Sequence, residues 1–245
     1  MSVRITGAIA LRVLTQLRRD HRTVAMLLVA PCMLMTLLWW LYLDQDPIFD
    51  RIGAPLLAVF PFVVMFLVTS VTTLGERKSG TLERLLAMPM GKIDFLVGYA
   101  AAFAILAIVQ SFLTTSLSLI FLGLDVAGSS VTLGLIAVLN SVLGTALGLF
   151  VSAFAETEFQ AVQFMPIFVI PQILLCGLLV PSEQMPGVLD AASQVLPLTY
   201  SVDAMQEVVA YADWTGDLTV DLIVVTVFAL GVLLLGAATL RRRTA

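Results

Sequence analysis

The sequence alternates between long apolar runs and short polar interruptions. Six runs reach the roughly 20 apolar residues that a helix needs to cross a bilayer, and Asp221 is the only charged residue within them. The pattern predicts membrane-spanning helices at residues 24–43, 52–74, 95–122, 131–154, 161–180 and 218–240. In the fourth run, Gly144 and Gly148 are spaced so that another helix can approach closely.

Residues 3–22 form a different pattern, with one basic side and one apolar side. At about 100° per residue, the arginines at positions 4, 12, 18, 19 and 22 fall within an arc of about 120°. A basic face opposite an apolar face is typical of a helix that lies in the membrane interface and contacts lipid headgroups. His21 is the only histidine, and we expect it at the surface because no second ligand-type residue accompanies it.

A charged segment, residues 75–90, separates the second and third apolar runs. Ser79 or Thr81 can cap a short helix, and Leu82, Leu85 and Leu86 fall on one face of it. Pro89 ends the pattern because the residue before a proline avoids the helical conformation. We predict a short amphipathic helix at 76–89 that is too short to be stable without a packing partner. The alternative interpretation is a solvated loop.

Prolines interrupt the fifth run and the segment after it. Pro166 and Pro171 each remove a backbone hydrogen bond and predict a kink. Residues 181–217 stay largely apolar and predict two short helices, near 187–195 and 200–211, that cannot span. We expect both to enter the outer leaflet, packed against protein rather than lipid. A structured external loop is the alternative.

Composition and charge agree with this pattern. Hydrophobic residues make up 60% of the chain and charged residues 12%, against about 25% charged in average soluble domains. An even number of spans puts both termini on one side, and that side holds 12 of the 13 lysines and arginines, all except Arg51. Positive charge collects on the cytoplasmic side. We therefore expect a multi-pass plasma-membrane protein with both termini in the cytoplasm.

Residues for catalysis are missing from the sequence. It has no phosphate-binding loop, no zinc-protease motif and no nucleophile elbow. Cys32 and Cys176 lie in separate apolar runs without metal-ligand spacing. We therefore expect no enzymatic activity and no cofactor or metal in this chain, and no binding of nucleic acid.

Two motifs carry a resemblance to a known family. The first is Glu76-Arg77-Lys78-x-Gly80-Thr81-Leu82-Glu83-x-Leu85-x-x-x-Pro89. The second joins Gly177-Leu178-Leu179-Val180-Pro181, Met185-Pro186 and Leu196-Pro197-Leu198-Thr199-Tyr200, followed by Asp203-Ala204. Together they resemble the ABC-2 type permeases, the membrane subunits of ATP-binding-cassette exporters, and among them the actinobacterial permeases of the daunorubicin-resistance type.

The resemblance implies a function and partners. A separate cytoplasmic ATPase subunit, holding ATP and Mg²⁺, would dock on the 76–89 helix and power export of a hydrophobic or amphiphilic drug or lipid. A second permease subunit, identical or different, would complete the pathway within the membrane lipids. The implied coupling residues are Glu76, Arg77, Gly80, Thr81, Leu82, Glu83, Arg84, Leu85 and Pro89. The implied outer gate or pathway residues are Pro171, Gly177, Leu178, Val180, Pro181, Met185, Pro197 and Tyr200.

The sequence departs from the family pattern at two positions. Gln206 stands where many members have a basic residue, and Tyr99 follows Gly98 where a Gly-Lys pair is common. We expect the second departure to affect only packing near the third span. Two other functions remain open: a membrane scaffold or accessory subunit, and a secondary carrier, although ionisable midplane sites typical of carriers are not evident.

Overall fold

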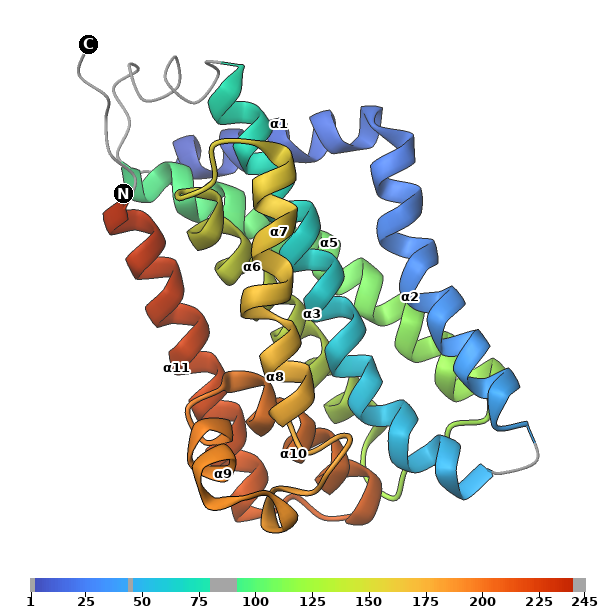
Figure 1. The fold of residues 1–245 in the computed structure, drawn as a ribbon. Helices are drawn as coiled ribbons and strands as arrows, with labels where there is room; N and C mark the ends of the chain where they lie inside the picture. The colour runs from blue at the N-terminus through green and yellow to red at the C-terminus, as the bar shows by residue number, and fades with distance from the viewer. Residues whose placement is uncertain (1–2, 44–45, 80–91, 240–245) are drawn as a thin grey trace.

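The chain is a bundle of α-helices (Figure 1). The computed structural model describes residues 3–43, 46–79 and 92–239. Six helices in these ranges are long and apolar enough to cross a membrane, which confirms the expected all-α membrane fold. The described residues include the predicted elements 3–22 and 181–217 in full, but only residues 76–79 of the predicted 76–89 helix.

Elements follow one another in the order that the sequence pattern predicts. Their bounds are α1 (Val3–Arg19), α2 (His21–Leu41), α3 (Asp46–Lys78), α5 (Lys92–Ser116), the π-helical turn η1 (Leu117–Phe121), α6 (Ser130–Ser152), α7 (Glu158–Phe168), α8 (Ile170–Leu175), the 3₁₀ turn η2 (Ser182–Gln184), α9 (Gly187–Ser193), α10 (Pro197–Ala210) and α11 (Gly216–Thr239).

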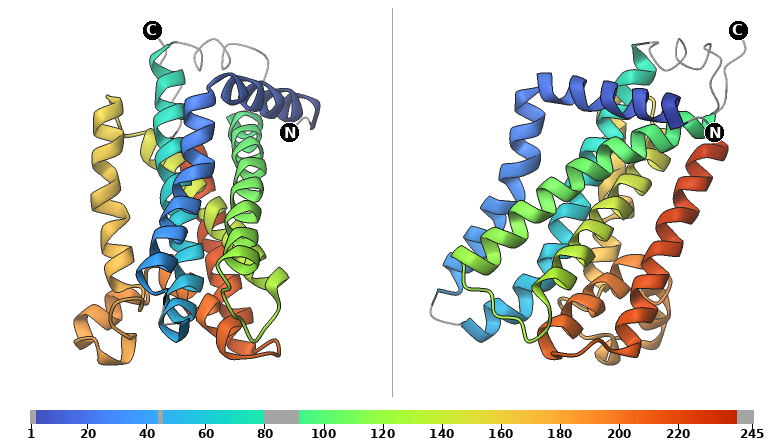
Figure 2. Two further views of the ribbon diagram at one scale, coloured as in Figure 1. Left: turned by 90° about the vertical axis from the view of Figure 1, so that its right-hand side faces the viewer. Right: turned by 180° about the vertical axis from the view of Figure 1, so that it is seen from behind.

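The N-terminal helix ends earlier than predicted. α1 stops at Arg19, and Asp20 caps the next helix by accepting a hydrogen bond from the Thr23 backbone N–H at 3.2 Å. The predicted boundary at residue 22 was therefore wrong, because the pattern of basic residues continues through a turn that an aspartate cap creates. α1 lies across one end of the bundle, called the α1 end below (Figures 1 and 2).

The second span is longer than predicted at both ends. α3 has 33 residues and continues through Glu76 and Arg77 to Lys78. The first residues of the predicted 76–89 helix therefore belong to the last turn of α3. The Ser79 hydroxyl donates to the Glu76 carbonyl at 3.0 Å, and the prediction that Ser79 or Thr81 caps a following helix concerns residues beyond the described range. Residues 80–91 lie outside the described part of the chain.

The prolines of the fifth span break it as expected. α7 ends at Phe168 and α8 begins at Ile170, with Pro171 in its first turn. α8 ends at Leu175, five residues before the predicted limit of 180. Gly177 then takes a φ of +83°, which favours glycine, and turns the chain away from the helix axis.

Two short helices follow, as the sequence predicts, while their entry into the outer leaflet stays a prediction. α10 begins three residues earlier than expected because Pro197 occupies its first turn. Thr199 Oγ1 donates to the Ser193 carbonyl at 2.8 Å, and the Tyr200 hydroxyl donates to the Gln194 carbonyl at 2.7 Å. These bonds fasten α10 to the end of α9. Both helices lie at the end of the bundle opposite α1 (Figure 1).

The centre of the bundle is the pair α3 and α6. A Cβ added at Gly148 would lie 2.6 Å from the Phe66 carbonyl oxygen, and one added at Gly144 would approach the Phe62 carbonyl still more closely. The expected close approach of another helix to this glycine pair is thus confirmed, and α3 is that helix. A second core forms where Ile9, Val13 and Leu17 of α1 pack against α5.

Candidate functional site

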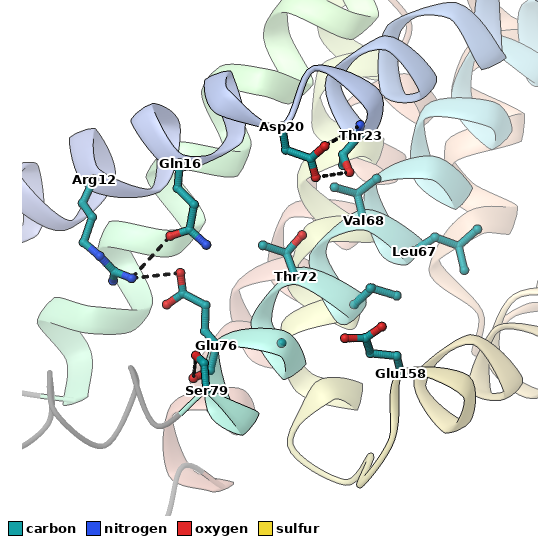
Figure 3. A pocket seen from close by; sticks show the side chains of 12 residues that line it. Arg12, Gln16, Asp20, Thr23, Leu67, Val68, Thr72, Glu76, Ser79 and Glu158 are labelled. Atoms are coloured by element: carbon teal, nitrogen blue, oxygen red, sulfur yellow. Dashed lines mark hydrogen bonds and ion pairs between the residues drawn. The ribbon is translucent and has the colours of Figure 1, made fainter.

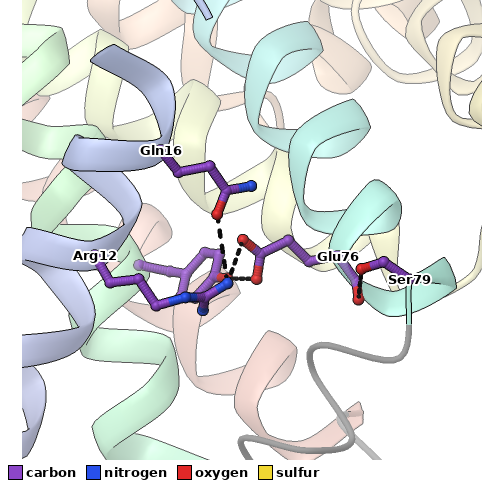
Figure 4. Close-up of polar contacts among 5 residues, drawn as sticks. Arg12, Gln16, Glu76 and Ser79 are labelled. Atoms are coloured by element: carbon purple, nitrogen blue, oxygen red, sulfur yellow. Dashed lines mark hydrogen bonds and ion pairs between the residues drawn. The ribbon is translucent and has the colours of Figure 1, made fainter. Parts of the chain in front are cut away.

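Three side chains from distant parts of the sequence meet at the α1 end. Arg12 Nη2 on α1 donates to Glu76 Oε1 on α3 at 3.0 Å (Figure 4). The hydroxyl of Tyr99 on α5 donates to Glu76 Oε2. Glu76 and Tyr99 are buried, with exposed fractions of 4% and 0%, while Arg12 is 33% exposed. We call Arg12, Glu76 and Tyr99 the α1 clamp.

Electrostatics favour the charged form of the arginine in this clamp. Burial opposes its charge, but attraction to Glu76 and the hydrogen bonds around it outweigh burial and raise the pKa of Arg12 above its ordinary value. Gln16 Oε1 accepts a longer bond of 3.4 Å from the same Nη2. A carboxylate that accepts from both a guanidinium and a hydroxyl forms charge-assisted bonds, which are stronger than neutral ones.

Local sequence explains how α1 comes close enough to form the clamp. A Cβ at Gly98 would lie 2.8 Å from Ile9 and 3.0 Å from the Thr6 carbonyl oxygen. Glycine at position 98 therefore lets α1 lie directly on α5, and the next residue, Tyr99, then reaches Glu76. The expectation that Tyr99 affects only packing was wrong, because its hydroxyl holds a buried carboxylate.

The clamp also links the two helices that flank the segment between α3 and α5. Residues 80–91 begin four residues after Glu76 and end eight residues before Tyr99. The Tyr99–Glu76 hydrogen bond thus connects the end of α3 to the first turns of α5, and the bond from Arg12 to Glu76 connects them to α1. Arg77 adds a bond to the Ser152 carbonyl at the end of α6.

The predicted coupling residues divide into two groups. Glu76 and Arg77 are described, and both are engaged in contacts within the chain. The other seven lie outside the described residues: Gly80, Thr81, Leu82, Glu83, Arg84, Leu85 and Pro89. Arg12 was predicted as one of several interfacial arginines, and its partner on α3 was not foreseen.

The predicted gate residues lie near the opposite end and differ in exposure. Pro171 and Val180 are exposed, Leu178 is half-buried against the core, and Pro197 is buried. Tyr200 binds the end of α9. Their role in a pathway stays a prediction. Among the described residues, no group of three histidine, cysteine or acidic side chains is placed to hold a metal ion.

Comparison with known proteins identifies the family. The sequence profile of the ABC-2 type transporter family matches residues 5–210, which is most of the chain. The chain belongs to the ABC-2 type transporter family. It is therefore a multi-pass membrane protein of the permease kind, and the clamp lies at one end of an ABC-2 fold.

Several curated proteins are similar to this ABC-2 chain. The probable multidrug ABC transporter permease YbhR of Escherichia coli (strain K12) is 27% identical over 153 residues, covering 62% of this chain and 42% of YbhR. The probable multidrug ABC transporter permease YbhS of the same strain is 26% identical over 145 residues, or 59% and 38%. ABC transporter G family member 20 of Dictyostelium discoideum is 23% identical over 159 residues, or 65% and 22%. The aligned part is less than half the length of each of these relatives.

A carboxylate at the end opposite the clamp gives this ABC-2 chain a pH-dependent stability. Burial, followed by repulsion from Glu207, raises the pKa of Asp203 from 3.8 to about 6. Because the folded state then holds the proton more tightly than the unfolded state, this contribution to stability falls as pH rises from 3.8 to about 6.

Asp203→Asn is therefore expected to raise the melting temperature at pH 7.5. The shift corresponds to about 3 kcal/mol, which partial solvent exposure reduces to about 1 kcal/mol, or about 3 °C. The gain should shrink toward zero at pH 4.5, measured by thermal unfolding of the detergent-purified protein. The control is Asp213→Asn, an exposed carboxylate near α11. Equal gains at both pH values, or the same gain in the control, would contradict the assignment.

Proposed function

We propose that this chain is the permease subunit of an ATP-driven exporter. It moves a hydrophobic or amphiphilic substrate outward across the plasma membrane, and a separate ATP-binding-cassette subunit supplies the energy. The names of the similar bacterial proteins, multidrug ABC transporter permeases, support this proposal. A scaffold or a secondary carrier has no comparable support from a specific residue.

The α1 clamp is the observation that carries the proposal. A transporter driven by a partner must pass a mechanical displacement from the partner into its own spans. Here the segment 80–91 is tied at its base to α1, α3 and α5 by the bonds of Glu76 with Arg12 and Tyr99. A displacement of that segment is therefore transmitted to α1, α3 and α5 together.

The distribution of charge gives the proposed orientation. The α1 end carries the basic residues of α1 and of the last turn of α3, together with the C-terminal end of α11. By the positive-inside tendency, this end faces the cytoplasm, where an ATPase subunit is available. The α9–α10 end then faces outward. A second permease subunit, identical or different, completes the transporter in this proposal.

Leu85→Asp is expected to abolish stimulation of the ATPase subunit and export, with loss of at least 90% of both. An aspartate would place a charge on the apolar stripe that packs on the partner. Glu83→Ala should weaken the same contact by about tenfold, which corresponds to about 1.4 kcal/mol. Co-purification of the two subunits, ATPase assays and export assays measure these effects.

Asp213→Ala is the matched control for Glu83→Ala, since both substitutions remove one carboxylate. Asp213 is exposed and lies in the short connection between α10 and α11. It should leave assembly and export unchanged. If Leu85→Asp still assembles with the ATPase subunit and exports normally, segment 80–91 is a solvated loop and this chain is not driven through it.

A further inference from the structure

A pocket opens beside the clamp on the side where α3 is flanked by the α1–α2 junction and by α7 (Figure 3). Its volume is about 550 Å³, which falls within the range of about 300–1,000 Å³ for small-molecule sites. The residues that line it come from these elements: Arg12, Gln16, Asp20, Thr23, Leu67, Val68, Val71, Thr72, Gly75, Glu76, Ser79 and Glu158.

One side of the pocket is apolar and belongs to α3. Leu67, Val68 and Val71 lie on the same face of this helix, and all are half-buried although they sit in a long apolar span. Leu67 packs partly against one core of the bundle and Val68 partly against the other, and both keep part of the side chain exposed. The exposed face is thus a surface on which the apolar body of a ligand can pack, at the level where α1 meets the spans.

The rim of the pocket is acidic. It holds three carboxylates, Asp20, Glu76 and Glu158, and one basic side chain, Arg12. Arg12 is paired with Glu76. Asp20 accepts two hydrogen bonds from Thr23 and is attracted by Arg22, which does not line the pocket. The side chains that line the pocket therefore carry more negative than positive charge. Hydrogen bonds from the Thr23 side chain and backbone lower the pKa of Asp20, so that it stays ionised.

Glu158 lies beside Gly75 at the wall of the pocket. Glu158, in the first turn of α7, places its Oε1 3.9 Å from the position of a Cβ at residue 75. In Figure 3, the Asp20 and Glu158 carboxylates lie on different sides of the pocket, with Thr72 between them. A positively charged group inside the pocket would therefore meet negative charge from two directions.

We propose that this pocket binds a lipophilic organic cation, with its apolar body on Leu67, Val68 and Val71 and its charge between Asp20 and Glu158. This inference rests on the proposed function and names the class of substrate that the exporter takes up. The carboxylates that line the pocket repel an anion of the same size, while a neutral molecule gains only the apolar contacts. The pocket also shares Arg12 and Glu76 with the clamp, so binding and coupling occur at adjacent residues.

Binding of radiolabelled tetraphenylphosphonium to the purified chain in phosphatidylcholine nanodiscs tests the proposal. Saturable binding is expected above that of empty discs. Tetraphenylborate, an anion of the same size and shape, should show no saturable component. The double variant Asp20→Asn/Glu158→Gln should lower the affinity for tetraphenylphosphonium at least tenfold, and Val71→Trp, which fills the apolar side, should do the same.

The matched control is Glu156→Gln, an exposed carboxylate two residues from Glu158 that does not line the pocket. Its affinity should equal that of the unmodified chain. Saturable binding of the anion, or an affinity that the double variant and Val71→Trp leave unchanged, would overturn the proposal. Melting temperatures of all variants separate loss of binding from loss of folding.

Discs that contain phosphatidylethanolamine distinguish two sources of the cation. A fall in tetraphenylphosphonium binding there assigns the pocket to a lipid amine, and unchanged binding assigns it to a free organic cation. This experiment needs no ATPase subunit. Absence of binding together with normal ATPase coupling would therefore overturn the substrate class alone, whereas binding without any coupling would overturn the proposed function.

Discussion

Replacing Glu76 by alanine is expected to release α1 from the bundle and to abolish ATP-driven export. The change removes the carboxylate that accepts from Arg12 and Tyr99, and it leaves the fully buried Tyr99 hydroxyl without this acceptor. Breaking a buried charge pair costs about 3–5 kcal/mol. Because one-third of Arg12 is exposed, we expect about 2–3 kcal/mol, or a fall in melting temperature of about 5–10 °C.

Limited trypsin digestion measures the release directly and needs no partner. Arg18 and Arg19 end α1 and are exposed, so a detached α1 should be cut there much faster than a docked one. Tyr99→Phe keeps the packing of the ring and should give a smaller effect of the same kind. Glu156→Ala, an exposed carboxylate outside the clamp, should behave like the unmodified chain.

A double-mutant cycle distinguishes loss of the Arg12–Glu76 ion pair from general destabilisation of the fold. Arg12→Ala and Glu76→Ala should cost less together than the sum of their separate effects, because each alone removes the same ion pair. Additive effects in the cycle, with a trypsin pattern that Glu76→Ala leaves unchanged, would show that α1 docks through its apolar face alone. If Glu76→Ala kept more than half of normal export, the clamp would not be required for coupling to the ATPase subunit.

Gly144→Leu is expected to prevent stable folding. The added Cβ would meet the Phe62 backbone carbonyl of α3 well within van der Waals contact, and backbone cannot move aside as a flexible side chain can. Overpacking a core usually costs about 1–3 kcal/mol, and this position exceeds that range because α3 and α6 would have to separate. Little monomeric protein should remain on size-exclusion chromatography after detergent extraction.

Gly134→Leu is a matched control on the same helix. Nothing lies within 4 Å of a Cβ at Gly134, so the same substitution there should leave expression and melting temperature nearly unchanged. Equal yields of the two variants would contradict the close packing of α3 and α6. Gly148→Ala should fall between them, since its smaller side chain still meets the Phe66 carbonyl at 2.6 Å.

Helix positions could be predicted well because they depend on local sequence. Apolar length determined the spans, and the prolines at 166 and 171 determined the break between α7 and α8. The glycine pair at 144 and 148 was recognised from its spacing, although the spacing did not say which helix would approach. Boundaries were less accurate where a cap or turn decided them, as at Asp20 and Gly177.

The clamp could not be predicted in the same way. Arg12 and Glu76 are separated by 64 positions, and Glu76 and Tyr99 by 23. In sequence, Arg12 looks like the other arginines of an interfacial helix, and Glu76 looks like a solvated residue of a charged segment. The sequence contained one signal: Tyr99, which follows Gly98, departs from the Gly-Lys pair of the pattern that the sequence resembles.

The sequence by itself determined the membrane class, the order of the helices, the amphipathic character of α1 and the family, because apolar length, periodicity and short motifs are local properties. Only the tertiary structure decided which charges are paired. It buried Glu76 between Arg12 and Tyr99 and placed Asp20 and Glu158 in the lining of one pocket. The physical reason is that a charge near the membrane surface has the same sequence context whether it faces water or a partner, and only helix packing brings the partner within 3.0 Å.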